Sequence, residues 1–154
     1  MFLPDKIDKA IIRELMPNAR ITITELASRV GLSKTPCQLR IKRLEEQGYI
    51  LGYETRVNLT KLELNHIAFV QVSMSNTSRT SLKKFNEAMK EIPEIEQCHM
   101  IAGGFDYLLK VRTTNMSVFR TILGDKISTL PDVVQTSTFV VMESVKEGSF
   151  EFSL

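Results

Sequence analysis

The chain has 154 residues, of which 43% are hydrophobic and 25% charged, as in globular proteins that bury a core. Its net charge of +2 is unevenly distributed: residues 1–60 contain ten Lys/Arg and seven Asp/Glu, whereas residues 61–154 contain ten and eleven. The excess positive charge therefore lies in the first part, where a polyanion could be held. Charge alone does not decide whether nucleic acid is a partner.

The cysteines and the N-terminus indicate where the protein is located. Cys37 and Cys98 lie far apart and form no CxxC pair, so a reducing compartment is expected. The first ten residues, MFLPDKIDKA, become acidic at once, unlike a signal peptide. No apolar run approaches the roughly 20 residues that span a bilayer. We expect a cytoplasmic protein with no membrane partner.

Two helices are predicted first along the chain. Apolar residues recur at steps of three and four between residues 5 and 16, which is typical of an amphipathic helix. Thr22 and Glu25 then have the spacing of a capping box, in which a hydroxyl accepts from a backbone amide and the glutamate bonds back. The short helix that they open should end near Val30.

A third helix follows after a tight turn. Gly31 is the residue type that most easily adopts the left-handed conformation at a helix end, and Ser33 is a good N-cap. Gly48 should end this helix. Three helices with such a turn form a helix-turn-helix arrangement. Residues 49–59 alternate bulky and polar side chains, so we expect a strand or short wing that leads out of the first domain.

The second part of the chain has a different pattern. The strands are predicted at residues 66–74, 95–103, 107–113 and 133–144, and the helices at residues 78–92 and 116–130. The order βαββαβ is the ferredoxin-like motif, an antiparallel sheet with two helices on one face. The other face is then free to pair with a second subunit or to cover a ligand. The fold class is α+β, with an N-terminal winged helix-turn-helix and a C-terminal ferredoxin-like domain.

The third helix has the composition of a DNA-recognition helix. On a helical projection Cys37, Ile41 and Leu44 form the core stripe, and the other faces present a hydroxyl, an amide, an aliphatic group and cations. Such groups can contact base edges and phosphates. The candidate DNA-binding residues are Ser33, Lys34, Thr35, Gln38, Leu39, Arg40, Lys42 and Arg43. The alternative is a solvated face on which Lys42 or Arg43 merely pairs with Glu46.

The motifs extend over nearly the whole chain and resemble one family. The segments are DKIDKAIIREL, ITELASRVGLSKTPCQLRIKRLEEQGYILGY, IEQCHMIAGGFDYLLKVR and TFVVMESVK. They resemble the Lrp/AsnC (leucine-responsive, feast-famine) family of prokaryotic transcription regulators. The resemblance implies a helix-turn-helix DNA-binding domain at 1–52, a linking strand or hinge at 53–65, and an effector-binding and oligomerisation domain at 66–154. It also implies nucleoid association, double-stranded DNA as partner, and homodimers that assemble further, commonly into octamers.

The resemblance further implies a binding site for an amino-acid effector between C-terminal domains. The residues concerned lie in the loop after the second strand and in the last strand: Ala102, Gly103, Gly104, Asp106, Tyr107, Thr136, Ser137 and Thr138. Glycines let backbone amides approach a carboxylate, and an aspartate can pair with an α-ammonium group. Close relatives often carry an acidic residue in place of Gly104 and an arginine in place of Ser137. From the residues alone, a simple hairpin turn capped by Asp106 is the favoured alternative.

No catalytic or metal chemistry is predicted. His66 and His99 have no neighbouring Cys/Asp constellation, and Gly103-Gly104 lacks the spacing of a phosphate loop, so no cofactor is expected. Two hypotheses remain. The first is a sequence-specific DNA-binding transcription regulator, not an enzyme, that responds to an amino acid and controls amino-acid metabolism genes. The second is a ferredoxin-like small-molecule-binding or catalytic protein whose N-terminal helices only dimerise.

Overall fold

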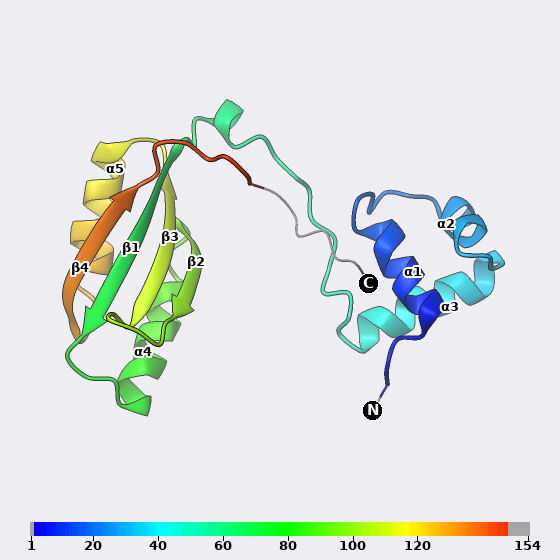
Figure 1. Cartoon of the computed structure of the whole chain (residues 1–154), viewed down its shortest axis with the longest axis horizontal. Coiled ribbons are helices and arrows are strands. Elements are labelled where there is room, and N and C mark those ends of the chain that lie inside the picture. Colours follow the sequence, from blue (N-terminus) through cyan, green and yellow to red (C-terminus); the bar gives the residue numbers. More distant parts are fainter. Residues whose placement is uncertain (1, 148–154) are drawn as a thin grey trace. The chain divides into compact units, whose positions relative to one another are not determined.

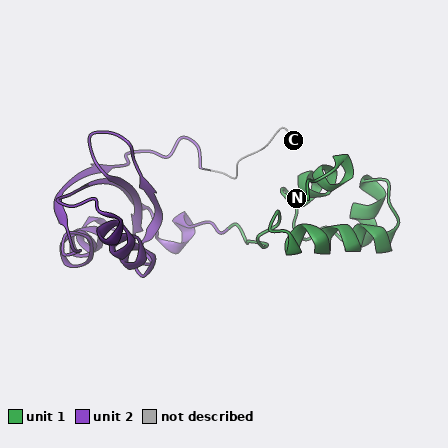
Figure 2. Cartoon of the chain, turned by 90° about the horizontal axis from the view of Figure 1, so that it is seen from below, with its two compact units in different colours: residues 1–56, 148–154 green, residues 57–147 purple. Residues whose placement is uncertain are grey.

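The computed structural model describes residues 2–147, and these residues form two compact units. The division lies between Arg56 and Val57, as the two colours in Figure 2 show. The last seven positions of the predicted C-terminal domain, 148–154, lie outside the described residues. Within the part of the chain that the structure describes, no helix is long and apolar enough to cross a membrane.

The first unit contains three helices, α1 (Lys6–Leu15), α2 (Ile23–Arg29) and α3 (Lys34–Glu46). A reciprocal capping box begins α1: Asp5 accepts from the backbone of Asp8, and Asp8 accepts from the backbone of Asp5. At α2 the Thr22 hydroxyl accepts from the Glu25 amide as predicted, but the Glu25 carboxylate pairs with Arg29 instead of bonding back.

The turn between α2 and α3 matches the prediction of a helix-turn-helix. Gly31 has a φ of 71°, in the left-handed region, and the Leu32 amide donates to the Ala27 carbonyl at 2.8 Å. Ser33 occupies the N-cap position of α3, although its hydroxyl makes no capping hydrogen bond. The buried core of the unit consists of Ile11, Leu26, Ala27, Cys37 and Leu44. The core stripe predicted for α3 is therefore confirmed at Cys37 and Leu44.

The strand expected at residues 49–59 does not form. Residues 50–58 adopt no regular secondary structure, and a 3₁₀ turn, η1 (Thr60–Leu62), follows. The alternating apolar side chains remain exposed: Leu51 at 94%, Tyr53 at 50% and Val57 at 58%. A strand needs a neighbouring strand to bond its backbone, and the described chain provides none here.

The second unit is a four-stranded antiparallel sheet with the strand order β2-β3-β1-β4. Its elements are β1 (His66–Met74), α4 (Arg79–Lys90), β2 (Ile95–Met100), β3 (Tyr107–Thr113), α5 (Met116–Thr121) and β4 (Val133–Val140). The predicted βαββαβ order and the α+β fold class are confirmed. The second strand ends three residues earlier than predicted, where the chain enters the loop at residues 101–106, and the last one ends four residues earlier, next to the start of its partner β1.

Both helices cover the same face of the sheet, as Figure 1 shows. The core between them and the sheet includes Val70, Val72, Phe85, Leu109 and Ile127. The predicted helix at 116–130 is not uniform, because α5 passes into a π-helical turn, η2 (Ile122–Ile127). The wider turn still buries Ile122 and Ile127 against the sheet.

Within residues 2–147, no helix of the second unit covers the other face of the sheet, which we call the uncovered face (Figure 1). Side chains alternate between the two faces of a strand, so the residues between the buried ones point to this uncovered face. Phe69 pairs with Lys110 on one side and with Phe139 on the other, and Gln71 pairs with Leu108 and Ser137. The Phe139 side chain is 54% exposed.

Candidate nucleic-acid interface and effector region

The exposed side of α3 carries most of the predicted DNA-binding residues. Ser33, Lys34, Thr35, Gln38, Leu39 and Lys42 are all exposed. Leu39 is 63% exposed, although it is an aliphatic residue in a unit that has a buried core. Lys42 lies 3.7 Å from Glu46 in a loose pair in which both side chains are exposed, and such pairs contribute little to stability. This surface therefore keeps hydroxyl, amide, aliphatic and cationic groups available to a ligand.

The two predicted arginines lie differently, because both bind Asp8 of α1. Arg40 Nη1 donates to Asp8 Oδ1 at 2.8 Å and to Asp5 Oδ2 at 2.7 Å, and Arg43 Nη2 donates to both oxygens of Asp8. Arg40 and Arg43 are only partly exposed. Sequence reasoning missed this cluster, because no local pattern relates α1 to α3 across more than 30 residues.

The electrostatics of this cluster stabilise its charged forms. The hydrogen bond from the Asp8 backbone amide, followed by that from Arg40, holds the pKa of Asp5 below its ordinary value. The hydrogen bonds to Asp5 and Asp8 raise the pKa of Arg40. The Arg40 cation is thus held at the edge of the exposed surface of α3.

The N-terminal segment also packs on Arg43. The Arg43 guanidinium lies 4.3 Å from the centre of the Phe2 ring, and the Tyr49 hydroxyl donates to the Phe2 carbonyl at 2.8 Å. The Phe2 and Tyr49 rings meet edge to face, with centroids 5.7 Å apart. Both ends of the unit therefore support the same arginine.

In the second unit, Asp106 ties the loop between β2 and β3 to β1. Its Oδ2 accepts from the Met74 amide at 2.7 Å, and its own amide donates to the Val72 carbonyl at 2.9 Å. Ala102, Gly103 and Gly104 are exposed beside it. Neither glycine has a positive φ, and a Cβ on Gly104 would meet nothing within 4 Å. The turn itself therefore does not require glycine at position 104.

The remaining predicted effector residues do not converge in one chain. Tyr107 is buried in the core, with its ring 4.3 Å from Phe85 and its hydroxyl bonded to Asn86. Thr136 lies level with Tyr107 because both pair with Val72, but two strand spacings, about 10 Å, separate them. Thr136 and Thr138 point to the helix-covered face, whereas Ser137 points to the uncovered face.

The uncovered face carries an ionic cluster that the sequence pattern did not reveal. Lys110 binds Glu96 at 3.0 Å and Glu147 at 3.1 Å, and Arg112 binds the same two carboxylates. Arg112 also donates to the Leu64 carbonyl at 3.0 Å. Burial alone would raise the pKa of Glu96, but the hydrogen bonds from Arg112 and Lys110 lower it.

The two histidines differ in their surroundings: His99 is exposed, whereas His66 packs within the second unit. His66 Nδ1 lies 3.0 Å from the Thr113 hydroxyl, and its ring is 5.3 Å from that of Phe119. Among residues 2–147 no group of three or more His, Cys, Asp or Glu side chains is placed to hold a metal ion.

Comparisons with known proteins agree with this architecture. Residues 67–149 match the model of the Lrp/AsnC ligand binding domain, and residues 4–50 match that of winged helix-turn-helix DNA-binding domains. The chain is 54% identical to the proline dehydrogenase transcriptional activator of Rhizobium radiobacter, over 93% of this chain and 92% of that protein. It is 43% identical to the leucine-responsive regulatory protein of Escherichia coli, over 94% and 88% of the two chains. A solved transcriptional regulator of Neisseria meningitidis, in complex with L-Met, superposes with a TM-score of 0.85 at 30% identity, covering 93% and 92%.

Proposed function

The chain belongs to the Lrp/AsnC family of DNA-binding transcription regulators, and from this premise we propose that α3 contacts specific base pairs in the DNA major groove. The observation that carries the proposal is the exposed surface of α3. Thr35 and Gln38 can hydrogen-bond base edges, and Leu39 can contact a thymine methyl group. The linker at 53–65 then acts as the hinge between the DNA-binding and effector domains.

The cations around this surface divide into two kinds. Lys34 and Lys42 are exposed, and we propose that their ammonium groups contact DNA phosphates. Arg40 and Arg43 are held by Asp8, so their guanidinium groups have lost much of their conformational freedom before DNA arrives. Contacts made by side chains that are already ordered cost less entropy on binding.

Salt dependence of DNA binding tests this proposal. Affinity for a target promoter fragment should fall steeply with salt concentration, because bound cations release counterions from the DNA. Lys42→Ala should reduce the slope of log affinity against log salt by about one, whereas Lys84→Ala, an exposed lysine in the other unit, should not. A flat salt dependence of the unsubstituted protein would instead favour the ferredoxin-like alternative, with helices that only dimerise.

Base preference is the second test of the same surface. Gln38→Ala should change the preference at one base pair by roughly 1–3 kcal/mol while leaving the salt slope unchanged. Binding competitions against single-base variants of the target site measure both quantities. Unchanged preference at every position would remove Gln38 from the interface.

The effector in this proposal is an amino acid bound where two copies of the second unit meet. The loop at 102–106 has exposed residues at 102–104 and open space at Gly104, and Ser137 lies on the uncovered face. The Neisseria meningitidis relative is described in complex with L-Met, which supports an amino acid as the class of ligand. The ligand must prefer one assembly over another, since equal affinity for both would shift nothing.

The uncovered sheet face supplies the assembly surface in this proposal. Phe69, Phe139 and Leu108 give it an apolar centre, and Lys110 and Arg112 lie beside them. We infer that two copies form a homodimer through this face and that such dimers assemble into a higher oligomer, up to an octamer.

The protein acts in the cytoplasm, on nucleoid DNA. The target is a gene of amino-acid metabolism, as the name of the Rhizobium radiobacter relative suggests. Regulation by binding, without catalysis, accounts for both units.

A further inference from the structure

A groove of about 450 Å³ lies between α4 and the edge strand β2, on the helix-covered side of the sheet. Its apolar wall comes from Met89, Ile95, Cys98 and Met100, and its floor includes Tyr107. Its volume is in the range of small-molecule sites. A second hollow continues along α4 and shares Asn86 and Lys90 with the groove.

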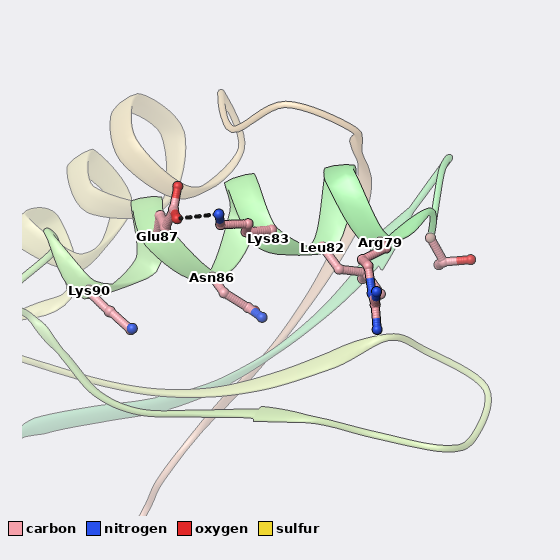
Figure 3. Close-up of a pocket in the computed structure, with 7 residues that line it drawn as sticks. Arg79, Leu82, Lys83, Asn86, Glu87 and Lys90 are labelled. Atoms are coloured by element: carbon pink, nitrogen blue, oxygen red, sulfur yellow. Dashed lines mark ion pairs between the residues drawn. The ribbon is translucent and has the colours of Figure 1, made fainter.

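Two side chains with hydrogen-bond donors line the border of this groove. The Tyr107 hydroxyl donates to Asn86 Oδ1 at 2.8 Å, which orients the amide and leaves its NH₂ group to face a ligand. Lys90 lies four residues further along α4, so it projects from the same side. Figure 3, which draws the second hollow, shows the Asn86 and Lys90 side chains pointing to the same side of α4. Among the described residues Lys90 makes no ion pair, unlike Lys83, which binds Glu87.

The carboxylate that lines the groove is already paired. Glu96 is the carboxylate among the groove-lining residues, but it binds Arg112 and Lys110, which belong to the uncovered face. A β-bulge between Ile95 and Gln97 interrupts the strand register where Glu96 lies. An α-ammonium group in the groove would therefore find no carboxylate whose charge is not already balanced.

From this arrangement we propose that the groove binds a small aliphatic carboxylate that has no α-amino group, at a site separate from the effector site between copies. The carboxylate accepts from the Asn86 amide and the Lys90 ammonium, and the aliphatic chain lies against Met89, Ile95 and Met100. Hydrogen bonds between charged groups supply orientation, and burial of the chain supplies the remaining affinity. Asn86 and Lys90 act only in binding.

Cys98 provides a direct measure of occupancy in the full-length protein. Its thiol is half-buried in the groove wall, whereas Cys37 is fully buried in the other unit and serves as an internal reference. The probe is 4-methylpentanoate, and the readout is the rate of Cys98 alkylation by iodoacetamide, followed by mass spectrometry. 4-Methylpentanoate should slow the reaction in a saturable manner, whereas 4-methylpentan-1-ol and L-leucine should be far weaker.

Substitutions separate this groove from other sites. Lys90→Gln should raise the concentration of 4-methylpentanoate needed for protection about tenfold, and Asn86→Asp should abolish protection by placing a negative charge beside the ligand. Lys84→Gln, on the same helix but outside the groove, should leave protection unchanged. Absence of protection, equal protection by the alcohol or by L-leucine, or an unchanged response of Lys90→Gln would each overturn the proposal. None of these outcomes bears on DNA binding or on the effector site near Asp106, which are measured separately.

Discussion

Asp8 and Arg43 join α1 to α3 through a carboxylate that has no exposed surface: Arg43 Nη2 donates to Asp8 Oδ1 at 3.1 Å and to Oδ2 at 3.0 Å. Arg40 adds a third bond to the same group. A buried carboxylate is costly unless it is paired and hydrogen-bonded, and here two cations and the Asp5 amide satisfy it. The exposed surface of α3 is therefore held in place by a charge on a different helix.

Asp8→Asn should lower the free energy of unfolding by roughly 2 kcal/mol, because the charge-assisted bonds to both arginines are lost while the side chain keeps its size. Urea unfolding followed by far-UV circular dichroism measures the change. Glu46→Gln is the matched control in the same unit, since it removes only an exposed pair and should change stability by less than about 0.5 kcal/mol. Equal effects of the two substitutions would contradict the role of Asp8.

The helices of the first unit could be predicted because their signals are local: Thr22 caps α2, Gly31 adopts a positive φ, and Cys37 with Leu44 forms the core stripe. The contacts of Arg40 and Arg43 could not, because a partner more than 30 residues away leaves no periodic trace. The same argument covers the Lys110–Glu96 cluster, which needs the register of two strands.

The linker shows a different limit of sequence reasoning. Residues 49–59 alternate bulky and polar side chains, and this pattern predicted a strand or short wing. Alternation reports which side chains suit a half-buried strand, but a strand forms only where another backbone is present to pair with it. For the effector region, the family resemblance implied the loop and the last strand, and which face of the sheet Ser137 occupies depends on the pairing of β4 with β1, which the sequence pattern does not contain.

Acid should weaken the second unit through the carboxylates of the uncovered face. The pKa of Glu147 is lowered first by the hydrogen bond from Lys110, and that of Glu96 is also below its ordinary value of 4.5. The folded state then binds fewer protons than the unfolded state, so the stabilisation is complete above pH 4.5 and is lost as pH falls through the folded pKa values.

Thermal unfolding of the protein and of Glu96→Gln, recorded between neutral pH and about pH 3, tests this dependence. The substituted protein should be less stable at neutral pH by about 1 kcal/mol, and the difference should shrink below pH 4.5. A difference that stays constant across the range would show that the charge of Glu96 does not contribute.

Phe139→Asp should reduce self-association. Phe139 pairs with Phe69 across β4 and β1 on the uncovered face, so a carboxylate there would be buried without a partner whenever two copies meet through this face. Analytical ultracentrifugation should show that the protein concentration at which half of the chains are associated rises at least tenfold. Met116→Asp, an equally drastic change at an exposed position at the start of α5, should leave assembly unchanged. Dissociation of both variants alike would point to general destabilisation instead.

Asp106→Asn should abolish the amino-acid response while preserving the loop. Replacing Asp106 by alanine would also leave the Met74 amide without its acceptor, so loss of response in that variant would not distinguish binding from folding. Asparagine keeps a carbonyl oxygen that can accept from Met74, and it removes only the charge that pairs with an α-ammonium group. Thermal-shift measurements against the twenty amino acids should show a ligand-induced rise in melting temperature for the unsubstituted protein and none for Asp106→Asn, because a ligand that binds the native state stabilises it. An unaltered rise in the variant would move the effector site away from this loop.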